Sequence, residues 1–301
     1  MRALELKSVR KSYDGVIAVN SLSLGIPQGC IYGLLGSNGA GKTTALRMMV
    51  GILMPDEGAV CIFGEPFERR HLKTIGYLPE ERGLYRKAKV NELLLYLGEL
   101  KGLSRTTIQC RIVELAERLG IGAALTRRIE ELSKGMEQKI HLITAMINDP
   151  QLLILDEPFA GLDPLNSALL TDLLFELKRA GHTILFSSHR MDRVEKLCDE
   201  ICLISHGTNI LQGAVPELKA RFGGQRVRLV YRGEAPFLDH NGSIESRINC
   251  GNTVELRVGA DANAQELLQT VAASATIIAY ETIEPSLEEI FIAAVRTHHG
   301  I

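Results

Sequence analysis

The spacing of apolar and polar residues changes several times along the chain. Residues 3–6 alternate apolar with polar positions and residues 16–19 are rich in β-branched side chains, which predicts two strands. Residues 151–155 are almost continuously apolar, as in a strand buried on both faces of a parallel sheet. Residues 89–130 instead repeat apolar positions at helical spacing. We therefore predict an α/β core interrupted by an inserted helical subdomain at about residues 89–148.

A smaller unit follows the glycine pair at Gly223 and Gly224. Its strand-like runs lie at residues 227–231, 254–258 and 275–280, and its helix-like runs at residues 262–272 and after Ser286. Ser286 and Glu289 have the spacing of a capping box, which predicts the start of the last helix. The predicted domains are residues 1–222 and a small α+β unit at residues 223–301, in which no catalytic constellation is found.

A glycine-rich segment after the third predicted strand has the phosphate-loop spacing G-x-x-x-x-G-K-[ST]. Its glycines let the backbone curl so that N–H groups point at an anion. Lys42 adds a positive charge for the β- and γ-phosphates, and the Thr43 hydroxyl is placed to hold Mg²⁺. A plain glycine-rich turn is the alternative, but the strand before it and the helix after it favour phosphate binding. The predicted ATP-binding residues here are Gly36, Ser37, Asn38, Gly39, Ala40, Gly41, Lys42, Thr43 and Thr44.

Two acidic residues, Asp156 and Glu157, end the continuous apolar strand and precede a proline. ATP hydrolysis needs a metal ion and a polarised water. We expect Asp156 to complete the metal shell and Glu157 to orient or deprotonate the attacking water. His189 ends the next predicted strand, from which it can reach the γ-phosphate. A lone carboxylate would more often cap a loop and a lone histidine would more often be structural, so the prediction depends on their occurrence together with the phosphate loop.

Three further residues have both a structural and a functional interpretation. Tyr13 lies on the first predicted turn, where an aromatic residue is ordinary, but a phosphate loop soon after favours stacking on adenine. Ser133 and Asp163 each precede a predicted helix and have the residue type of an N-cap. A capped helix N-terminus is also an anion site, so the two interpretations are compatible.

Composition restricts the possible partners. The 301 residues suggest about two domains, and a net charge of −2 favours no nucleic-acid partner. No apolar run approaches the roughly 18–20 residues that span a bilayer, and the charged first residues do not look like a signal peptide. We expect a cytoplasmic protein that reaches a membrane only through a partner. Cys198 and Cys202 lack a second pair of ligands, so we expect the six cysteines to be buried thiols without metal.

These motifs, in this order, resemble the ATPase subunit of ABC transporters over residues 1 to about 220. Gly36–Thr43 corresponds to the Walker A motif, and Asp156 ends a Walker B motif. Leu132-Ser-Lys-Gly-Met136 resembles the signature motif, usually Leu-Ser-Gly-Gly-Gln. The other correspondences are Glu157 with the catalytic base, Ala160–Asp163 with the loop that crosses to the partner subunit, His189 with the switch histidine, and Tyr13 with the adenine-stacking aromatic residue.

The resemblance implies a P-loop NTPase core with an antiparallel β subdomain, an inserted helical subdomain and a small C-terminal α+β domain. It also implies a head-to-tail dimer, homodimeric or heterodimeric, that binds ATP and Mg²⁺ and drives an integral membrane permease from the cytoplasmic face. ATP would lie between Walker A of one subunit and the signature of the other. The implied contacts to the partner's ATP are Ser133, Lys134, Gly135, Met136 and Asp163. Residues 76–85 and 285–292 resemble a bacterial exporter subgroup that includes sodium-efflux types.

The chain departs from the family pattern at two motifs. Glu80 occupies the place of a usual glutamine, so the metal ligands implied are Thr43, Glu80 and Asp156; an ionised glutamate binds Mg²⁺ but cannot donate a hydrogen bond. Lys134 and Met136 replace glycine and glutamine in the signature. The alternative function is a soluble ATP-switched module that acts on ribosomes or DNA without a permease. One Walker A motif, the absence of a long coiled coil and the net charge of −2 disfavour it.

Overall fold

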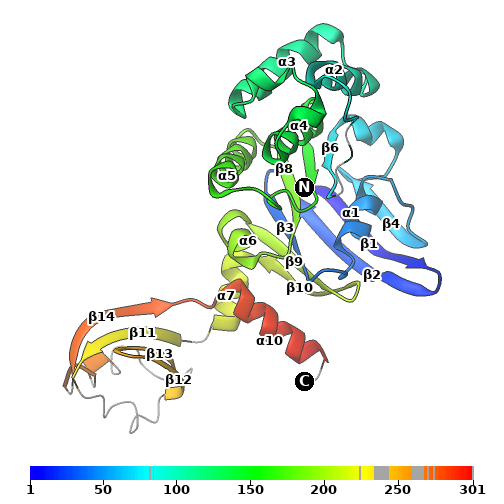
Figure 1. Ribbon diagram of the computed structural model, residues 1–301. Coiled ribbons are helices and arrows are strands. Elements are labelled where there is room, and N and C mark those ends of the chain that lie inside the picture. The colour runs from blue at the N-terminus through cyan, green and yellow to red at the C-terminus, as the bar shows by residue number, and fades with distance from the viewer. Residues whose placement is uncertain are drawn as a thin grey trace. The chain divides into compact units, whose positions relative to one another are not determined.

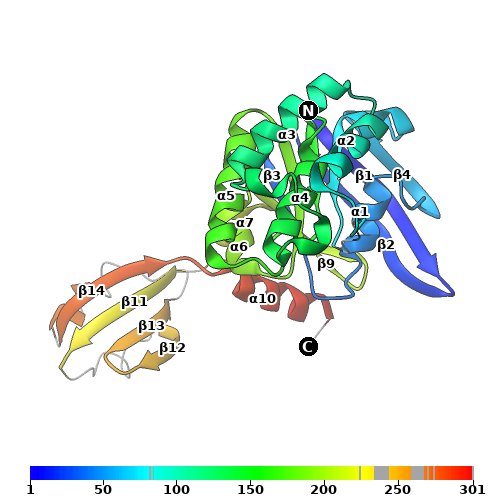
Figure 2. The ribbon, with the colours of Figure 1, turned by 45° about the horizontal axis from the view of Figure 1, so that its top comes forward.

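Figure 1 shows the computed structural model of the chain, and Figure 2 shows it turned. The structure describes residues 1–80, 83, 85–223, 225–233, 244–258, 268–269, 271–273 and 275–299. The chain divides into two compact units, Met1–Gly213 and Ala214–Ile301. The boundary predicted after residue 222 stays a prediction. Among the helices in the described ranges, none has the length and apolar character needed to cross a membrane.

An antiparallel sheet opens the first unit. The strand order is β2-β1-β4-β5, with β1 at Arg2–Tyr13, β2 at Val16–Pro27, β4 at Glu57–Ile62 and β5 at Glu65–Pro66. The turn between β1 and β2 uses Asp14 and Gly15, both with positive φ, as hairpin turns require. Leu4 and Leu6 alternate inward with 0% and 1% exposure. The predicted hairpin is therefore confirmed.

A second sheet has the order β10-β9-β3-β8-β7-β6. Its strands are β3 (Ile31–Leu35), β6 (Ile75–Leu78), β7 (Leu152–Leu155), β8 (Thr183–Ser188), β9 (Glu200–Ser205) and β10 (Thr208–Ala214). The strands from β9 to β6 pair in parallel, and β3, β7 and β8 are buried along their whole length. The carboxyl ends of these parallel strands lie at one edge, which is where nucleotides bind in open α/β sheets.

The helices of the first unit follow the predicted order. They are α1 (Lys42–Met49), α2 (Val90–Leu100), α3 (Arg105–Arg118), α4 (Lys134–Met146), α5 (Pro164–Arg179) and α6 (Met191–Leu197), with short 3-10 segments at Arg69–Lys73, Gly122–Ala124 and Ile129–Glu131. Helix α1 contacts the antiparallel sheet, whereas α4, α5 and α6 contact β6, β8 and β3. Leu46 and Met49 of α1 join one apolar core with residues of both sheets. This core fixes the loop that precedes α1.

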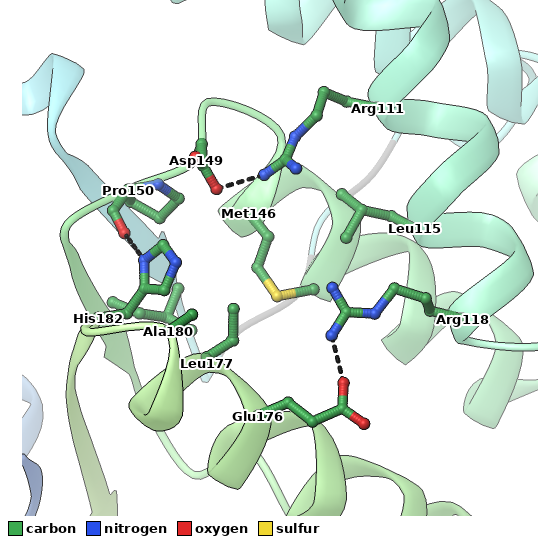
Figure 3. Close-up of a pocket in the computed structure, with 11 residues that line it drawn as sticks. Arg111, Leu115, Arg118, Met146, Asp149, Pro150, Glu176, Leu177, Ala180 and His182 are labelled. Carbon is green, nitrogen blue, oxygen red and sulfur yellow. Dashed lines mark hydrogen bonds and ion pairs between the residues drawn. The ribbon is translucent and has the colours of Figure 1, made fainter.

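The inserted helices α2 and α3 pack on α4 (Figure 1). Figure 3 shows how α3 meets the core: Arg111 bonds to Asp149 before β7, and Arg118 bonds to Glu176 on α5. Leu115 lies between the two arginines and is 2% exposed. Apolar contact and two ion pairs therefore join the insertion to the parallel-sheet core.

The second unit is built on another antiparallel sheet. Its order is β12-β13-β11-β14, with β11 at Gln225–Arg232, β12 at Ile244–Cys250, β13 at Thr253–Val258 and β14 at Thr276–Ile283. Helices α7 (Val215–Gly223) and α10 (Leu287–His299) contact each other. Ser286 and Glu289 exchange backbone-to-side-chain hydrogen bonds of 2.9 and 3.3 Å, which confirms the predicted capping box. Strand β12 was not predicted, and the predicted helix at residues 262–272 lies largely outside the described residues.

The cysteines carry no metal site in the described part of the chain, where no cluster of three or more His, Cys, Asp or Glu suits a metal ion. Cys30, Cys61, Cys198 and Cys202 are buried and free, as predicted. Burial raises the pKa of the Cys202 thiol to about 12, which keeps it protonated and unreactive. Cys110 is exposed on α3, so the expectation of burial was wrong there. It lies on the polar face of an amphipathic helix.

Candidate active site

The phosphate loop joins β3 to α1. At two of its glycines, neighbouring backbone leaves no room for a side chain. A Cβ at Gly36 would lie 2.5 Å from the carbonyl oxygen of Ile204, and one at Gly41 would lie 2.4 Å from that of Ala18. Gly41 also has φ +102°, which strains any other residue. The two glycines therefore let the loop run close to neighbouring backbone before it enters α1.

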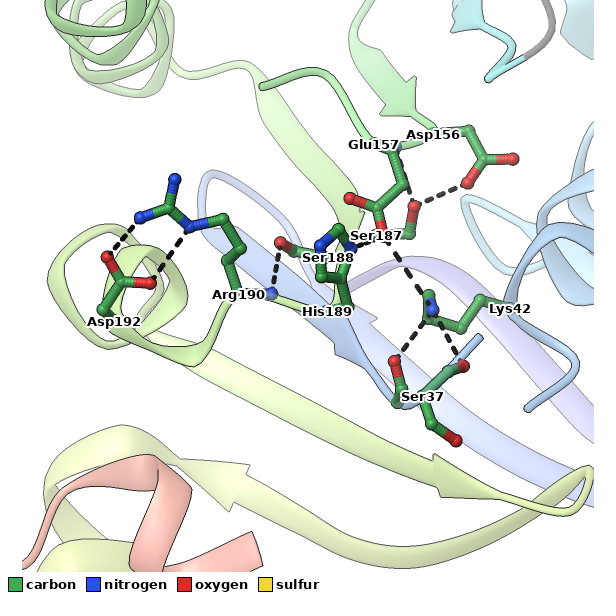
Figure 4. A network of polar contacts seen from close by, with 10 residues as sticks. Ser37, Lys42, Asp156, Glu157, Ser187, Ser188, His189, Arg190 and Asp192 are labelled. Carbon is green, nitrogen blue, oxygen red and sulfur yellow. Dashed lines mark hydrogen bonds and ion pairs between the residues drawn. The ribbon is translucent and has the colours of Figure 1, made fainter. Parts of the chain in front are cut away.

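Lys42, the first residue of α1, is held by the loop itself (Figure 4). Its Nζ donates to the carbonyl oxygens of Gly36 at 2.8 Å and Ser37 at 3.1 Å, and lies 3.9 Å from Oε1 of Glu157. The side chain is 7% exposed. Burial lowers the pKa of the amine, while the nearby carboxylates of Glu157, Asp156 and Glu80 oppose that shift. The amine is thus a buried cation with acidic groups around it.

A cavity of about 410 Å³ lies in front of the loop. Its lining brings together the loop, the start of α1 and two of the predicted acids: Ala18, Asn38, Gly39, Gly41, Lys42, Thr43, Thr44, Glu80 and Glu157. Of the other predicted loop residues, Gly36 and Ser37 support Lys42 through their carbonyls, and Ala40 is 3% exposed behind the loop. The cavity therefore brings residues of the phosphate loop and the Lys42 side chain together with two acidic side chains.

Asp156 and Glu157 directly follow β7, but of the two only Glu157 lines this cavity. Asp156 is 0% exposed, and its Oδ1 accepts a 2.6 Å hydrogen bond from the Ser187 hydroxyl. Its Oδ2 is buried and has no hydrogen-bond partner among the described residues. An unpartnered buried carboxylate oxygen is costly unless a cation or a donor approaches it. This oxygen is accordingly the one suited to a metal ion.

Glu157 is held in an unusual backbone conformation, with φ +46°. Its N–H donates to the Ser187 hydroxyl at 2.9 Å. Left-handed backbone at a residue other than glycine costs on the order of 1–3 kcal/mol and persists where the surroundings fix it. With this backbone, the Glu157 side chain, which is 7% exposed, lines the cavity beside Lys42.

His189 follows β8 and meets the same carboxylate. Its Nδ1 lies 3.0 Å from Oε1 of Glu157, while half of the ring is exposed at 51%. The dashed contacts in Figure 4 run from His189 through Glu157 to Lys42. The structure therefore brings together the predicted base, the predicted histidine and the phosphate-loop lysine.

The signature segment and the loop before α5 lie beside each other but do not line this cavity. The Ser133 hydroxyl accepts from the N–H of Met136 at 3.3 Å, and Asp163 accepts from the N–H of Asn166 at 2.8 Å. Both residues are therefore N-caps, as predicted. The hydrogen bonds from Asn166 hold the pKa of Asp163 below its usual range. Nδ2 of Asn166 lies 3.5 Å from the Cβ position of Gly135, so the two helix starts are adjacent. Lys134 is exposed beside them.

Tyr13 also lies outside the cavity lining. It ends β1, is 43% exposed, and has the Lys11 amine 5.9 Å from the centre of its ring. The neighbouring strand β2 contributes Ala18 to the cavity. The Tyr13 ring is therefore partly accessible to solvent.

Sequence reasoning missed Ser187 and Gln138. Ser187 binds both acids, but β8 also carries the hydroxyls of Thr183 and Ser188, so residue type alone did not single it out. Gln138, on α4, is 2% exposed and donates through Nε2 to the carbonyl oxygen of Pro158. It thereby ties the signature helix to the segment that follows Glu157.

Comparison with known proteins agrees with this geometry. The ABC transporter family profile matches residues 19–160, and the profile of the C-terminal domain of DrrA1-3-like ATP-binding proteins matches residues 213–295. The chain is 41% identical over 292 residues to the uncharacterized ABC transporter ATP-binding protein YhaQ of Bacillus subtilis, covering 97% of this chain and 98% of that one. It is 38% identical over 234 residues to the Nod factor export ATP-binding protein I of a Rhizobium species, covering 77% of each.

Solved structures show the same fold. The structure of an ATP-binding subunit of an ABC transporter superposes with a TM-score of 0.67 at 29% identity, over 73% of this chain and 93% of that one. With a relative matched along nearly its whole length and a nucleotide site of this geometry, the chain belongs to the ATP-binding subunits of ABC transporters, ATPases that hydrolyse ATP to power transport.

Proposed function

We propose that the cavity in front of the phosphate loop is the hydrolytic site of this ATPase. The observation that carries the proposal is that Lys42 and Glu157 both line that cavity and that His189, from a third element, contacts the Glu157 carboxylate. The β- and γ-phosphates would replace the carbonyls of Gly36 and Ser37 as partners of the Lys42 amine. N–H groups of residues 36–44 would complete the cradle. Tyr13 would stack on the adenine.

The acidic groups suit a magnesium ion. Thr43 and Glu80 line the cavity, and Asp156 has a buried oxygen that no described residue bonds, so hydroxyl and carboxylate oxygens of the kind Mg²⁺ prefers are present. We assign Thr43, Asp156 and Glu80 as the residues that would hold the ion. Bound there, Mg²⁺ would neutralise charge on the phosphates. Glu80 differs from a glutamine in adding a negative charge to this site.

Glu157 is proposed as the base that orients the attacking water and takes its proton. Its carboxylate lies in the cavity with Lys42 3.9 Å away, so the carboxylate faces the place where the phosphates would lie. His189 donates through Nδ1 to that carboxylate when the Nδ1 atom is protonated, which orients both groups. Nε2 would then be the ring nitrogen left to contact a γ-phosphate oxygen.

The second half of the site is proposed to come from another ATP-binding subunit. Ser133, Lys134, Gly135 and Met136 start α4, and Asp163 starts α5, away from the cavity lining. The N–H groups at the start of α4 suit a γ-phosphate. We infer that they serve the ATP of a partner copy, in a homodimer or heterodimer. A Glu157→Gln chain should then form dimers with ATP, and light scattering that shows only monomers at saturating ATP would contradict this.

We further propose that residues 1–222 form the ATP-binding domain, with its helical insert at about residues 89–148, and residues 223–301 an accessory domain. The ATP-binding domain would act on a separate integral membrane permease at the cytoplasmic face of the membrane. The similar Nod factor protein is named for export, which favours export as the direction. The alternative, an ATP-switched module without a permease, has no observation in its favour.

Capture of partners tests this assignment. Tagged Glu157→Gln protein loaded with ATP would be mixed with detergent-solubilised membranes of the host, with the Lys42→Ala variant as a matched control. We expect a stoichiometric multi-span protein that depends on ATP binding. Recovery of the chain alone, or of a soluble complex, would leave the ATPase site standing and contradict the permease.

A further inference from the structure

Ser187 lies where two strands of the parallel sheet deliver their ends to the active site. Its side chain is 0% exposed, on β8. Leu155 of β7 pairs with Phe186 of β8, so one step further along the sheet Asp156 comes opposite Ser187. The Ser187 hydroxyl on β8 therefore faces the two acids that follow β7.

The Ser187 hydroxyl makes one hydrogen bond to each acid. It donates to Oδ1 of Asp156 at 2.6 Å and accepts from the N–H of Glu157 at 2.9 Å. The first bond uses one carboxylate oxygen and leaves Oδ2 of Asp156 as the oxygen without a partner among the described residues. The second bond holds the peptide that precedes the Glu157 side chain, where the backbone has φ +46°.

We propose that Ser187 is a positioning residue for both acids: its hydroxyl selects the Asp156 oxygen that binds Mg²⁺ and holds Glu157 in the strained backbone conformation that directs its carboxylate at the attacking water. This rests on the roles proposed above for Asp156 and Glu157. Groups that orient metal ligands typically change metal affinity or activity by about 10–100-fold when they are removed.

The test is a kinetic and binding comparison of Ser187→Ala with wild type. We expect kcat for ATP hydrolysis to fall by about 10- to 100-fold. The Mg²⁺ concentration that gives half-maximal tightening of nucleotide binding should rise by a similar factor. The affinity for ATP in EDTA should stay at the wild-type value, because the phosphate loop is untouched. Ser187→Thr keeps the hydroxyl and should restore both quantities.

Ser188→Ala is the matched control. Ser188 is the next residue of the same strand and is also buried, but its hydroxyl accepts from the N–H of Arg190 and bonds to neither acid. Ser188→Ala should therefore leave the Mg²⁺ dependence of nucleotide binding unchanged. If Ser187→Ala does not fold, Ser187→Cys carries the test, since a thiol of similar size is a weak donor and acceptor.

Two results would overturn the inference. One is wild-type kcat and Mg²⁺ dependence in folded Ser187→Ala. The other is an equal loss of ATP affinity with and without Mg²⁺, which would indicate a general structural role. Asp156→Asn and Glu157→Gln, measured in parallel, distinguish failure of the active site from failure of the positioning role. If these two variants retain activity, the proposed active site is wrong. If only Ser187→Ala retains activity, the positioning role alone is wrong.

Discussion

Oε1 of Glu157 lies 3.0 Å from Nδ1 of His189, although the two residues follow different strands of the parallel sheet. Residues in direct contact act as a unit, so their substitutions should not be additive. We expect Glu157→Gln to lower kcat by at least about 10²-fold, as loss of a general base does, and His189→Ala to lower it too. The double variant should be no slower than Glu157→Gln alone. Steady-state ATPase rates of the four proteins measure this; losses that multiply would show that the contact has no catalytic meaning.

The backbone of Glu157 supplies a second prediction, on stability. Its φ of +46° suits glycine better than alanine. Glu157→Gly should therefore unfold with a free energy about 1 kcal/mol higher than Glu157→Ala, because both lack the carboxylate and only alanine keeps the strain. Asp172, exposed on α5, is the matched control. There the free energy of unfolding of the glycine variant should be about 0.5–1 kcal/mol lower than that of the alanine variant. Urea unfolding measures the glycine and alanine variants at both positions. If alanine is the more stable variant at Glu157 as well as at Asp172, the account is contradicted.

A third prediction concerns how the helical insertion is attached to the core (Figure 3). Leu115 is 2% exposed, whereas the side chains of the Arg118–Glu176 pair are 34% and 52% exposed. We expect Leu115→Ala to lower the free energy of unfolding by about 2–5 kcal/mol, and Arg118→Ala by at most about 1 kcal/mol because solvent screens the pair. Urea unfolding compares them. If Arg118→Ala costs as much as Leu115→Ala, the ion pair is the main attachment.

A fourth prediction concerns pH and Lys101, at the end of α2. Burial lowers the pKa of its amine to about 8, and Nζ donates to the Thr144 carbonyl and to Oδ1 of Asn148. Between about pH 8 and roughly 10.4 the unfolded chain binds more protons at this residue than the folded chain. Its contribution therefore makes the free energy of unfolding rise with pH across that window. Lys101→Met should flatten this part of the pH dependence, and the exposed Lys73→Met should not; an unchanged slope in Lys101→Met would refute the assignment.

The sequence predicted most of the elements because their patterns are local. The continuous apolar run of β7, the glycines of the phosphate loop and the N-caps Ser133 and Asp163 each require particular residues within a few positions. The convergence of Glu157, His189 and Lys42 was predictable in outline, since parallel strands end at one edge. Ser187 was not predicted because its role depends on the register between β7 and β8. Strand β12 was missed because Ser246 occupies the position between Ile244 and Ile248 where the alternation requires an apolar residue.

The central claim is that Glu157 carries hydrolysis and Lys42 carries nucleotide binding in one cavity. The most direct test measures ATP affinity by calorimetry and ATP turnover on the same preparations of wild type, Glu157→Gln and Lys42→Ala. The account predicts wild-type affinity with at least about 10²-fold slower turnover for Glu157→Gln, and weakened affinity for Lys42→Ala. Wild-type turnover by Glu157→Gln, or unchanged affinity in Lys42→Ala, would contradict it.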